Sequence, residues 1–294
     1  MQTLRAALVG EVLGTFLLVL FGTGSVACAV LTGALQGLWQ VAVVWGFGVT
    51  IAIYCSAALS GAHLNPAVSL AFAVLRPHAF SPRRLLPYCI AQLVGAVLAA
   101  LAVWGMFAPF LARFELRENL VRGAAGSERA AMIFGEYFPN PAMFGTGPDA
   151  AMLVSPFAAM LVEAFGTAIL VLVIFALSDP ENAAAPEPTL VPFFIGFTVA
   201  VLISLFAPIT QAGWNPARDF GPRLVALLAG FGTIAIPGPN GGFWIYIVGP
   251  LLGGLVGGSL YERVIGPLLP RKRPAGVEEA GRERDKGRDH GLQH

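Results

Sequence analysis

The sequence predicts an all-α membrane protein with six transmembrane helices and two re-entrant half-helices, arranged as an inverted repeat. Three observations support this fold class: the shortage of charge, the lengths of the apolar runs and a set of residues that recurs in both halves. The chain has 294 residues, of which 56% are hydrophobic and only 12% charged. About a quarter of a soluble domain is charged. The formal net charge of +1 implies no polyanionic partner, and we expect no nucleic-acid binding.

Six apolar segments are long enough to cross a bilayer, which takes about 20 mostly apolar residues. They are residues 4–31, 39–59, 85–108, 156–177, 190–207 and 243–264. Two shorter apolar segments remain, at residues 66–75 and 216–229. At 1.5 Å per residue the first would be about 15 Å long, half the thickness of the hydrocarbon core. Such a segment is expected to be re-entrant, with its end covered by protein or by a water-filled cavity.

Basic residues gather on one side of this six-span arrangement. They are Arg5, Arg76, Arg83, Arg84, Arg263, Arg271, Lys272 and Arg273. The short loops on the other side, residues 32–38 and 230–242, contain neither Lys nor Arg. Because cytoplasmic loops are enriched in these residues, we expect both termini in the cytoplasm and the chain in the cell (inner) membrane. The charged tail at residues 268–294 is expected to be disordered.

Three markers recur in the same order in the two halves of the chain. They are Glu11 and Glu163, Gly46 and Gly196, and the Asn-Pro-Ala tripeptides that begin at Asn65 and Asn215. The glutamates stand 54 and 52 residues before the asparagines, and both glycines stand nineteen residues before them. Three spans per half give the halves opposite orientations, so the repeat is inverted and its site is expected at the midplane.

These matches divide the chain into parts. One membrane domain is expected over residues 1–267, with repeat one at about 5–108 and repeat two at about 156–266. The long connection at residues 109–155 joins the two repeats and is expected outside the cell.

Each Asn-Pro-Ala tripeptide is expected to begin a half-helix. Pro66 and Pro216 suit the first helical position, where the missing N–H is not needed. The preceding asparagine can cap the helix by accepting from exposed backbone N–H groups, ahead of Ala67 or Ala217. Its side-chain NH₂ is then expected to be free to donate into a cavity. Two half-helices meeting at their N-termini would also bring two positive dipole ends together, which favours neutral solutes and disfavours cations.

Two segments resemble the repeated motif of the major intrinsic proteins, the aquaporins and glycerol facilitators. Residues 60–68, Ser-Gly-Ala-His-Leu-Asn-Pro-Ala-Val, look like the first copy, and residues 213–223 look like the second. The Phe-Pro-Asn-Pro sequence at 138–141 fits as well, and the resemblance covers about residues 5–266.

The resemblance implies a passive channel. Asp219 directly after Arg218 is typical of the glycerol-conducting branch. We therefore expect diffusion of glycerol and other small neutral solutes, with some water, through a homotetramer that has one pore per subunit in the lipid bilayer. No cofactor, no metal and no enzymatic activity are expected. The apolar outer faces and the glycine-lined last span also favour a homotetramer.

Four residues are expected to form the selectivity filter when the chain is counted back from the two motifs. They are Trp45, Ile203, Ala212 and Arg218. Bacterial glycerol facilitators typically have Gly at the Ile203 position and Phe at the Ala212 position, so this chain departs from them. The set looks like that of a plant nodulin-26-like subgroup that passes glycerol and neutral metalloids. A water channel and a neutral metalloid (arsenite-type) channel therefore remain alternatives.

Four further residues are interpreted as supports. Glu11 and Glu163 lie inside apolar spans, where a charge is costly. They could relay protons in a secondary active transporter, but the resemblance favours carboxylates that accept from backbone N–H groups of the nearby re-entrant loops. His63 is expected to hold its loop by hydrogen bonds, and Asp219 to act through loop shape.

Overall fold

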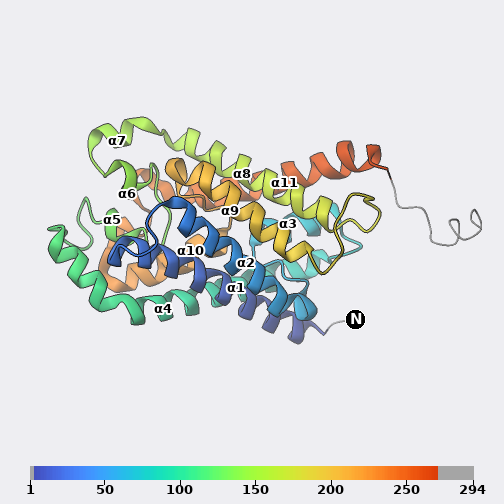
Figure 1. Cartoon of the computed structure of the whole chain (residues 1–294), viewed down its shortest axis with the longest axis horizontal. Helices are drawn as coiled ribbons and strands as arrows, with labels where there is room; N and C mark the ends of the chain where they lie inside the picture. Colours follow the sequence, from blue (N-terminus) through green and yellow to red (C-terminus); the bar gives the residue numbers. More distant parts are fainter. Residues whose placement is uncertain (1–2, 271–294) are drawn as a thin grey trace, which may run out of the picture.

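The computed structural model describes residues 3–270, and six of the helices in that range are long and apolar enough to cross a membrane (Figure 1). These spans are α1 (Leu4–Ala27), α2 (Leu38–Ser60), α4 (Leu85–Arg117), α8 (Pro156–Leu177), α9 (Val191–Thr210) and α11 (Ile245–Leu260). The half-length helices are α3 (Pro66–Leu75) and α10 (Pro216–Ala226). The all-α, six-span prediction is confirmed. Of the tail predicted to be disordered, residues 271–294 lie outside the described residues.

Short turns extend three of these helices beyond their α-helical part. Wider π-type turns continue α1 over Cys28–Thr32, α10 over Leu227–Phe231 and α11 over Tyr261–Ile265. With these extensions the predicted ends agree with the observed ones to within a few residues, except at the end of α4.

The end of α4 differs from the prediction. The helix expected to stop at residue 108 continues through Pro109 to Arg117. A proline inside a helix removes a backbone hydrogen bond and crowds the preceding turn, so tertiary contacts must offset its cost here. Beyond it, Leu111 and Phe114 are buried at helical spacing against the long connection, which includes Ile133. The connection therefore begins after Arg117, and its short helices are α5 (Glu128–Ala131), α6 (Pro141–Phe144) and α7 (Pro148–Leu153).

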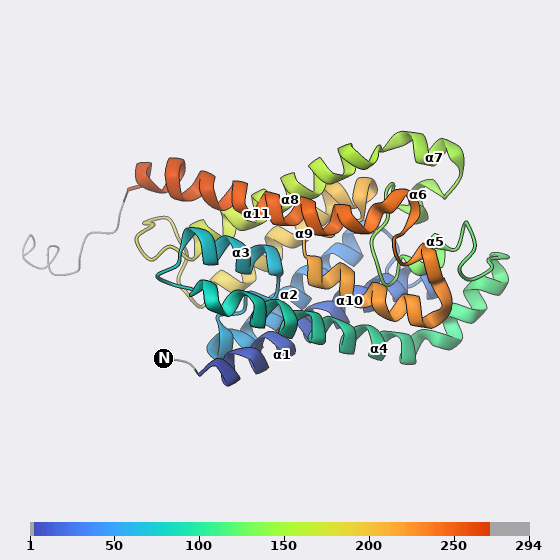
Figure 2. The same ribbon diagram turned by 180° about the vertical axis from the view of Figure 1, so that it is seen from behind.

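The spanning helices run side by side, and the two half-helices pack between α4 and α11 (Figure 2). In the first half α1 packs against α2 and α4, and in the second α8 packs against α11 and α9. The start of α1 and the end of α11 lie at one end of the molecule, and α5, α6 and α7 lie at the other (Figure 1). This arrangement agrees with an even number of crossings.

The two halves meet where α2 crosses α9, at the two glycines that mark the repeat. A Cβ atom on Gly46 would lie 2.6 Å from the carbonyl oxygen of Gly196, so no larger side chain fits there. The hydroxyl of Thr50, one turn along α2, donates to the carbonyl oxygen of Pro192 at 3.3 Å. Small residues allow helix backbones to approach closely inside a membrane. The equal spacing of these glycines in the sequence therefore reflects a contact between the repeats.

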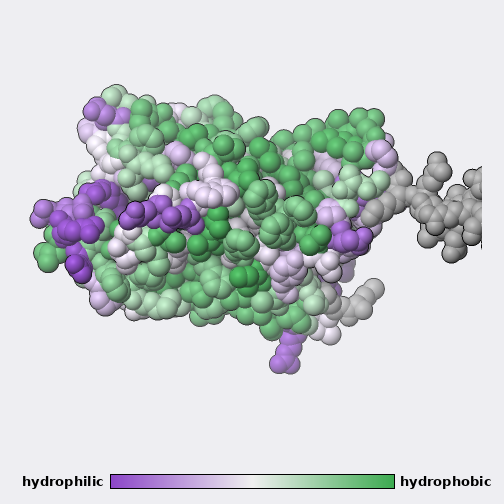
Figure 3. Space-filling view, viewed as in Figure 1, coloured by the Kyte–Doolittle hydropathy of each residue, from purple (hydrophilic) through white to green (hydrophobic). Residues whose placement is uncertain are grey.

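The glycines of the last span do not serve the purpose that we expected. Gly253 and Gly257 lie against the backbone of Ala164 and Ala168 on α8, inside the same subunit. The expectation that this glycine face supports contacts between subunits is therefore wrong. The outer surface is covered by larger apolar side chains, and Figure 3 shows hydrophobic residues over most of the middle of the molecule. This surface suits contact with lipid or with apolar faces of other subunits.

Candidate pore and selectivity filter

One short loop leads from α2 into α3 and another leads from α9 into α10. The two loops have similar backbone conformations. In each loop the φ angles are positive at the residues four, three and one places before the asparagine. These residues are Gly61, Ala62 and Leu64 in the first loop, and Gln211, Ala212 and Trp214 in the second. Residues other than glycine rarely adopt positive φ. The inverted repeat thus extends to the loop conformation, which the surrounding protein must hold in place.

Both asparagines cap their half-helices as predicted. The Oδ1 atom of Asn65 accepts from the backbone N–H of Ala67 at 2.8 Å. The Oδ1 atom of Asn215 accepts from the N–H groups of Ala217 at 3.1 Å and Arg218 at 3.2 Å. The helices therefore start at Pro66 and Pro216, as the tripeptides indicate.

The side-chain NH₂ groups are not entirely free, which corrects our expectation. Asn65 Nδ2 donates to the carbonyl oxygen of Trp214 at 2.9 Å, and Asn215 Nδ2 donates to that of Leu64 at 2.8 Å. Each asparagine thus ties the loop of the other half. An amide carries two N–H groups, so each asparagine has a second N–H besides the one in this bond, and both residues line the larger cavity described below.

Each buried glutamate holds one of the two loops. Glu11 accepts from the backbone N–H groups of His63 at 3.0 Å and Leu64 at 2.7 Å. Glu163 accepts from Gly213 at 3.0 Å and Trp214 at 2.7 Å. Both side chains are fully buried, and a buried charge needs such partners. These contacts match the structural interpretation of the two acids.

Two cavities meet at the predicted filter. The larger, of about 500 Å³, contains both asparagines in its wall and reaches Ala79 and Pro188, in connections at the end where α1 begins. The smaller, of about 320 Å³, is lined in part by the long connection at the opposite end. Trp45, Ile203 and Arg218 line both cavities. These three residues therefore stand where the two cavities join.

The four predicted filter residues come from three helices and one loop around this junction. Trp45 projects from α2, Ile203 from α9 and Arg218 from α10, while Ala212 lies in the second loop. The guanidinium carbon of Arg218 lies 4.5 Å from the centroid of the Trp45 ring, within the range of a cation–π interaction. Ala212 lines the larger cavity. The four residues thus combine the aromatic face of Trp45, the apolar side chains of Ile203 and Ala212, and the hydrogen-bond donors of Arg218.

Comparison with known proteins agrees with this geometry. The family model described as major intrinsic protein matches residues 1–261. The chain belongs to the major intrinsic protein family. It is 43% identical over 262 residues to the glycerol uptake facilitator protein of Pseudomonas aeruginosa, covering 88% of both chains. It is 40% identical over 271 residues to the Haemophilus influenzae protein of the same name, covering 92% of this chain and 97% of the relative.

A solved structure of the family has the same fold. The X-ray structure of the aquaglyceroporin from Plasmodium falciparum superposes with a TM-score of 0.76 at 28% sequence identity. The match covers 90% of this chain and 98% of that one. As a major intrinsic protein with six apolar helices, the chain is a multi-pass membrane protein.

Glu136, a residue of the long connection that contacts Arg218, was not predicted from the sequence. Its carboxylate forms an ion pair with the guanidinium of Arg218. A second donor of Arg218, Nη1, bonds to the carbonyl oxygen of Phe134 at 3.2 Å. The filter arginine of this major intrinsic protein is thus held by the connection. No repeat marks Glu136, and the sequence contained no signal that would have singled it out.

Asp219 fixes the same connection, in keeping with a role through loop shape. Its carboxylate accepts from the backbone N–H of Glu136 at 2.7 Å and from Arg223 Nε at 2.7 Å. All three side chains are almost completely buried. Arg223 was also not predicted as a site residue, although it lies one helical turn after Asp219.

His63 lies in the wall of the larger cavity, in the loop that leads into α3. Its ring Nδ1 lies 3.2 Å from the Ser69 hydroxyl, and its ring stacks on Phe72 with centroids 4.8 Å apart. Phe80 packs against it at 4.4 Å. These contacts fit the prediction that His63 holds its loop. Among residues 3–270, no group of three or more His, Cys, Asp or Glu side chains is placed to hold a metal ion.

Proposed function

We propose that this protein is a passive channel through which glycerol and other small uncharged solutes, with some water, diffuse down their gradients. One observation carries the proposal: two cavities approach each other from opposite ends and meet at Trp45, Ile203 and Arg218. It is supported by the relatives at 40% and 43% identity, which are named glycerol uptake facilitators. No catalytic step is part of the proposal.

The filter chemistry suits a polyol better than water. The Trp45 ring offers an apolar face to a carbon skeleton, and Arg218 can donate to a hydroxyl. Ile203 and Ala212 have no polar side-chain group, so water passing them cannot replace the hydrogen bonds that it gives up. We therefore propose that glycerol passes readily and that water passes less well than in a pore with a polar residue in place of Ile203.

Two features at the asparagines, between the filter and the end where α1 begins, disfavour cations. The N-termini of α3 and α10 bring positive dipole ends to the two asparagines. The remaining amide N–H groups of Asn65 and Asn215 offer donors only. A neutral solute that accepts hydrogen bonds is favoured there, and a cation is not.

Coupled transport is the less suitable alternative. An ion-coupled transporter needs a site for the coupling ion, and the candidates from sequence were Glu11 and Glu163. Both acids are occupied by backbone N–H groups of the two loops. A neutral metalloid channel is the second candidate, because Ala212 leaves the filter without a second aromatic ring.

We also propose the setting of the channel. The described chain begins and ends at one end of the molecule, close to basic residues such as Arg5, Arg83 and Arg263. Because basic residues are enriched on the cytoplasmic side of membrane proteins, we propose that this end faces the cytoplasm and that the channel lies in the inner membrane. A homotetramer with one pore per subunit would cover part of the apolar outer surface.

Swelling of proteoliposomes under osmotic gradients of glycerol, urea and arsenite, together with shrinkage in an impermeant solute, tests the proposed function. Glycerol should always move down its own gradient, and imposed pH or Na⁺ gradients should not drive it uphill. A channel that carries water and rejects glycerol contradicts the proposal, as does flux that follows an ion gradient. Entry of arsenite faster than glycerol would favour the metalloid alternative.

A further inference from the structure

Glu136 provides a buried carboxylate at the outer side of the filter. Its side chain is 1% exposed, and that of its partner Arg218 is 4% exposed. Both residues line the smaller cavity, which lies between the filter and the long connection. Charges this deeply buried are tolerated when they are paired. The pair therefore neutralises the filter arginine at the place where a solute enters.

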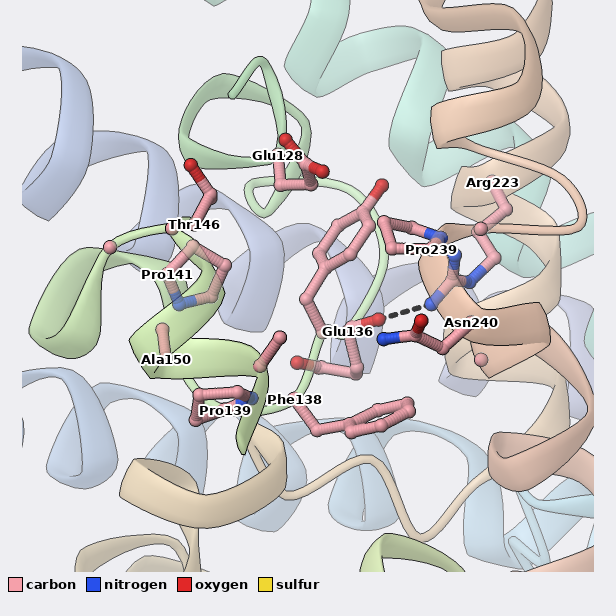
Figure 4. A pocket seen from close by; sticks show the side chains of 16 residues that line it. Glu128, Glu136, Phe138, Pro139, Pro141, Thr146, Ala150, Arg223, Pro239 and Asn240 are labelled. Atoms are coloured by element: carbon pink, nitrogen blue, oxygen red, sulfur yellow. Dashed lines mark hydrogen bonds between the residues drawn. The ribbon is translucent and has the colours of Figure 1, made fainter. Parts of the chain in front are cut away.

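The backbone of Glu136 is fixed from the other side by α10. Its N–H donates to Asp219, and its carbonyl oxygen accepts from the Arg223 guanidinium, a bond drawn in Figure 4. Asp219 and Arg223 also form an ion pair with each other at 2.7 Å. The carboxylates of Glu136 and Asp219 thus balance the charges of the Arg218 and Arg223 guanidinium groups. The backbone of Glu136 is therefore held in place independently of its contact with Arg218.

The ion pair fixes the guanidinium between two surfaces. On one side lie Glu136 and the carbonyl oxygen of Phe134, and on the other lies the ring of Trp45. Neither carboxylate oxygen of Glu136 has a hydrogen bond among the described residues, so Arg218 is its one charged contact there. The position of Arg218 in the constriction therefore depends strongly on the ionised state of Glu136.

We propose that Glu136 is a further selectivity-determining residue, a positioning residue whose ionised carboxylate neutralises Arg218 and holds it against the wall of the filter. The inference rests on the proposed channel function. With the carboxylate ionised, the constriction is uncharged and has a fixed width. With the carboxylate neutral, Arg218 carries an uncompensated charge and is free to enter the lumen. Glycerol, the larger solute, then loses more permeability than water.

The charge state of Glu136 changes in an accessible pH range. Burial raises the pKa of Glu136 to about 8, while Arg218 and Arg223 act to lower this pKa. The other titratable groups that face it are Asp219 on α10, Glu163 on α8, Tyr246 on α11 and Tyr137 beside it. Above this pKa the carboxylate is ionised and paired, and below it the pair is lost. The glycerol-to-water permeability ratio should therefore rise as pH rises.

The test compares glycerol and water permeabilities of proteoliposomes between about pH 6 and about pH 9.5, on either side of this titration. In the wild-type channel the ratio should rise about three- to tenfold, a change of about 0.7–1.4 kcal/mol between the two permeation barriers. Glu136→Gln should keep a low ratio at every pH, and Glu136→Asp should restore the rise. Glu128→Gln is the matched control, since Glu128 lies in the same connection and bonds to Gly126; it should keep the wild-type profile.

Several outcomes would overturn the inference. A wild-type ratio that does not change with pH contradicts it without any variant. A pH-dependent ratio that persists unchanged in Glu136→Gln assigns the titration to another group and also contradicts it. If the wild-type channel passes no glycerol, the proposed function fails instead, and the two failures are therefore distinguishable.

Discussion

The side-chain amide of Asn65 donates to the backbone carbonyl oxygen of Trp214, 2.9 Å away in the opposite half of the chain. Asn215 returns the same contact to Leu64. Each asparagine therefore has two tasks in the structure, since it caps a half-helix and ties the other loop, and its second N–H has the proposed task of donating to solute. A substitution that spares one task and removes the others separates them experimentally.

Asn65→Asp keeps the acceptor that caps α3 but removes the N–H donor. The new carboxylate would face the carbonyl oxygen of Trp214 and place a negative charge in the pore. We expect glycerol permeability to fall by about tenfold or more, the scale of one buried polar group left without its hydrogen-bond partner. A cation leak is the alternative outcome. Stopped-flow swelling and a K⁺-leak assay on the same vesicles measure both. Unchanged glycerol flux without a leak would show that the donor has no role.

Glu163→Gln tests whether the buried acids are supports or proton carriers. Glutamine would present its NH₂ to the N–H of Trp214 or lose its bond to Gly213. We expect the free energy of unfolding to fall by about 2–3 kcal/mol, as for a lost hydrogen bond to a charged group. Thermal unfolding in detergent measures this. Glu11→Gln should behave alike, because Glu11 holds the first loop in the same way.

The proton-relay alternative makes the opposite prediction for this pair of variants. Unchanged stability, together with a proton gradient that drives glycerol uphill in the wild type but not in the variants, would identify the acids as carriers. Such a result would also contradict the passive channel.

The sequence predicted the elements that obey local or repeated rules. The start of α3 follows from Asn65 and Pro66, which cap and begin a helix whatever surrounds them. Gly46 and Gly196 stand at equal distances before their asparagines because the two glycines pack against each other. Glu136 obeys no such rule, because its partner Arg218 is distant in the chain and the connection has no counterpart in the repeat. The continuation of α4 past Pro109 depends likewise on tertiary burial of Phe114.

The prediction on assembly concerns two faces of α11. One packs against α8 inside the subunit, and the other is exposed on the outer surface. The wild-type protein should have the mass of a homotetramer in mild detergent. Gly253→Leu should lower the unfolding temperature, because Gly253 lies against the backbone of Ala164 in the same subunit, and overpacking costs about 1–3 kcal/mol. Val256→Ala is the control on the same helix, since Val256 is 62% exposed, and its unfolding temperature should stay near the wild-type value.

Mass measurement and thermal unfolding together decide this prediction. Gly253→Leu subunits that unfold at the wild-type temperature but dissociate would place the glycine at a subunit interface after all. A wild-type protein that is only monomeric would contradict the tetramer.

The filter prediction concerns Ala212, where this chain lacks the second aromatic ring. Ala212→Phe would put a ring into the wall of the larger cavity, beside the pair of Trp45 and Arg218. The narrower opening should reduce glycerol permeability by about tenfold and water permeability less, because an added aromatic side chain affects the larger solute first. Since Ala212 has a φ of 68°, a side chain there is strained, and Ala212→Gly serves as the relaxed control that should keep glycerol flux.

Equal loss of glycerol, urea and water in Ala212→Phe would mean that the loop has collapsed and not that the pore has narrowed. Loss of glycerol in Ala212→Gly would mean that Ala212 acts through loop conformation and not through the width of the filter.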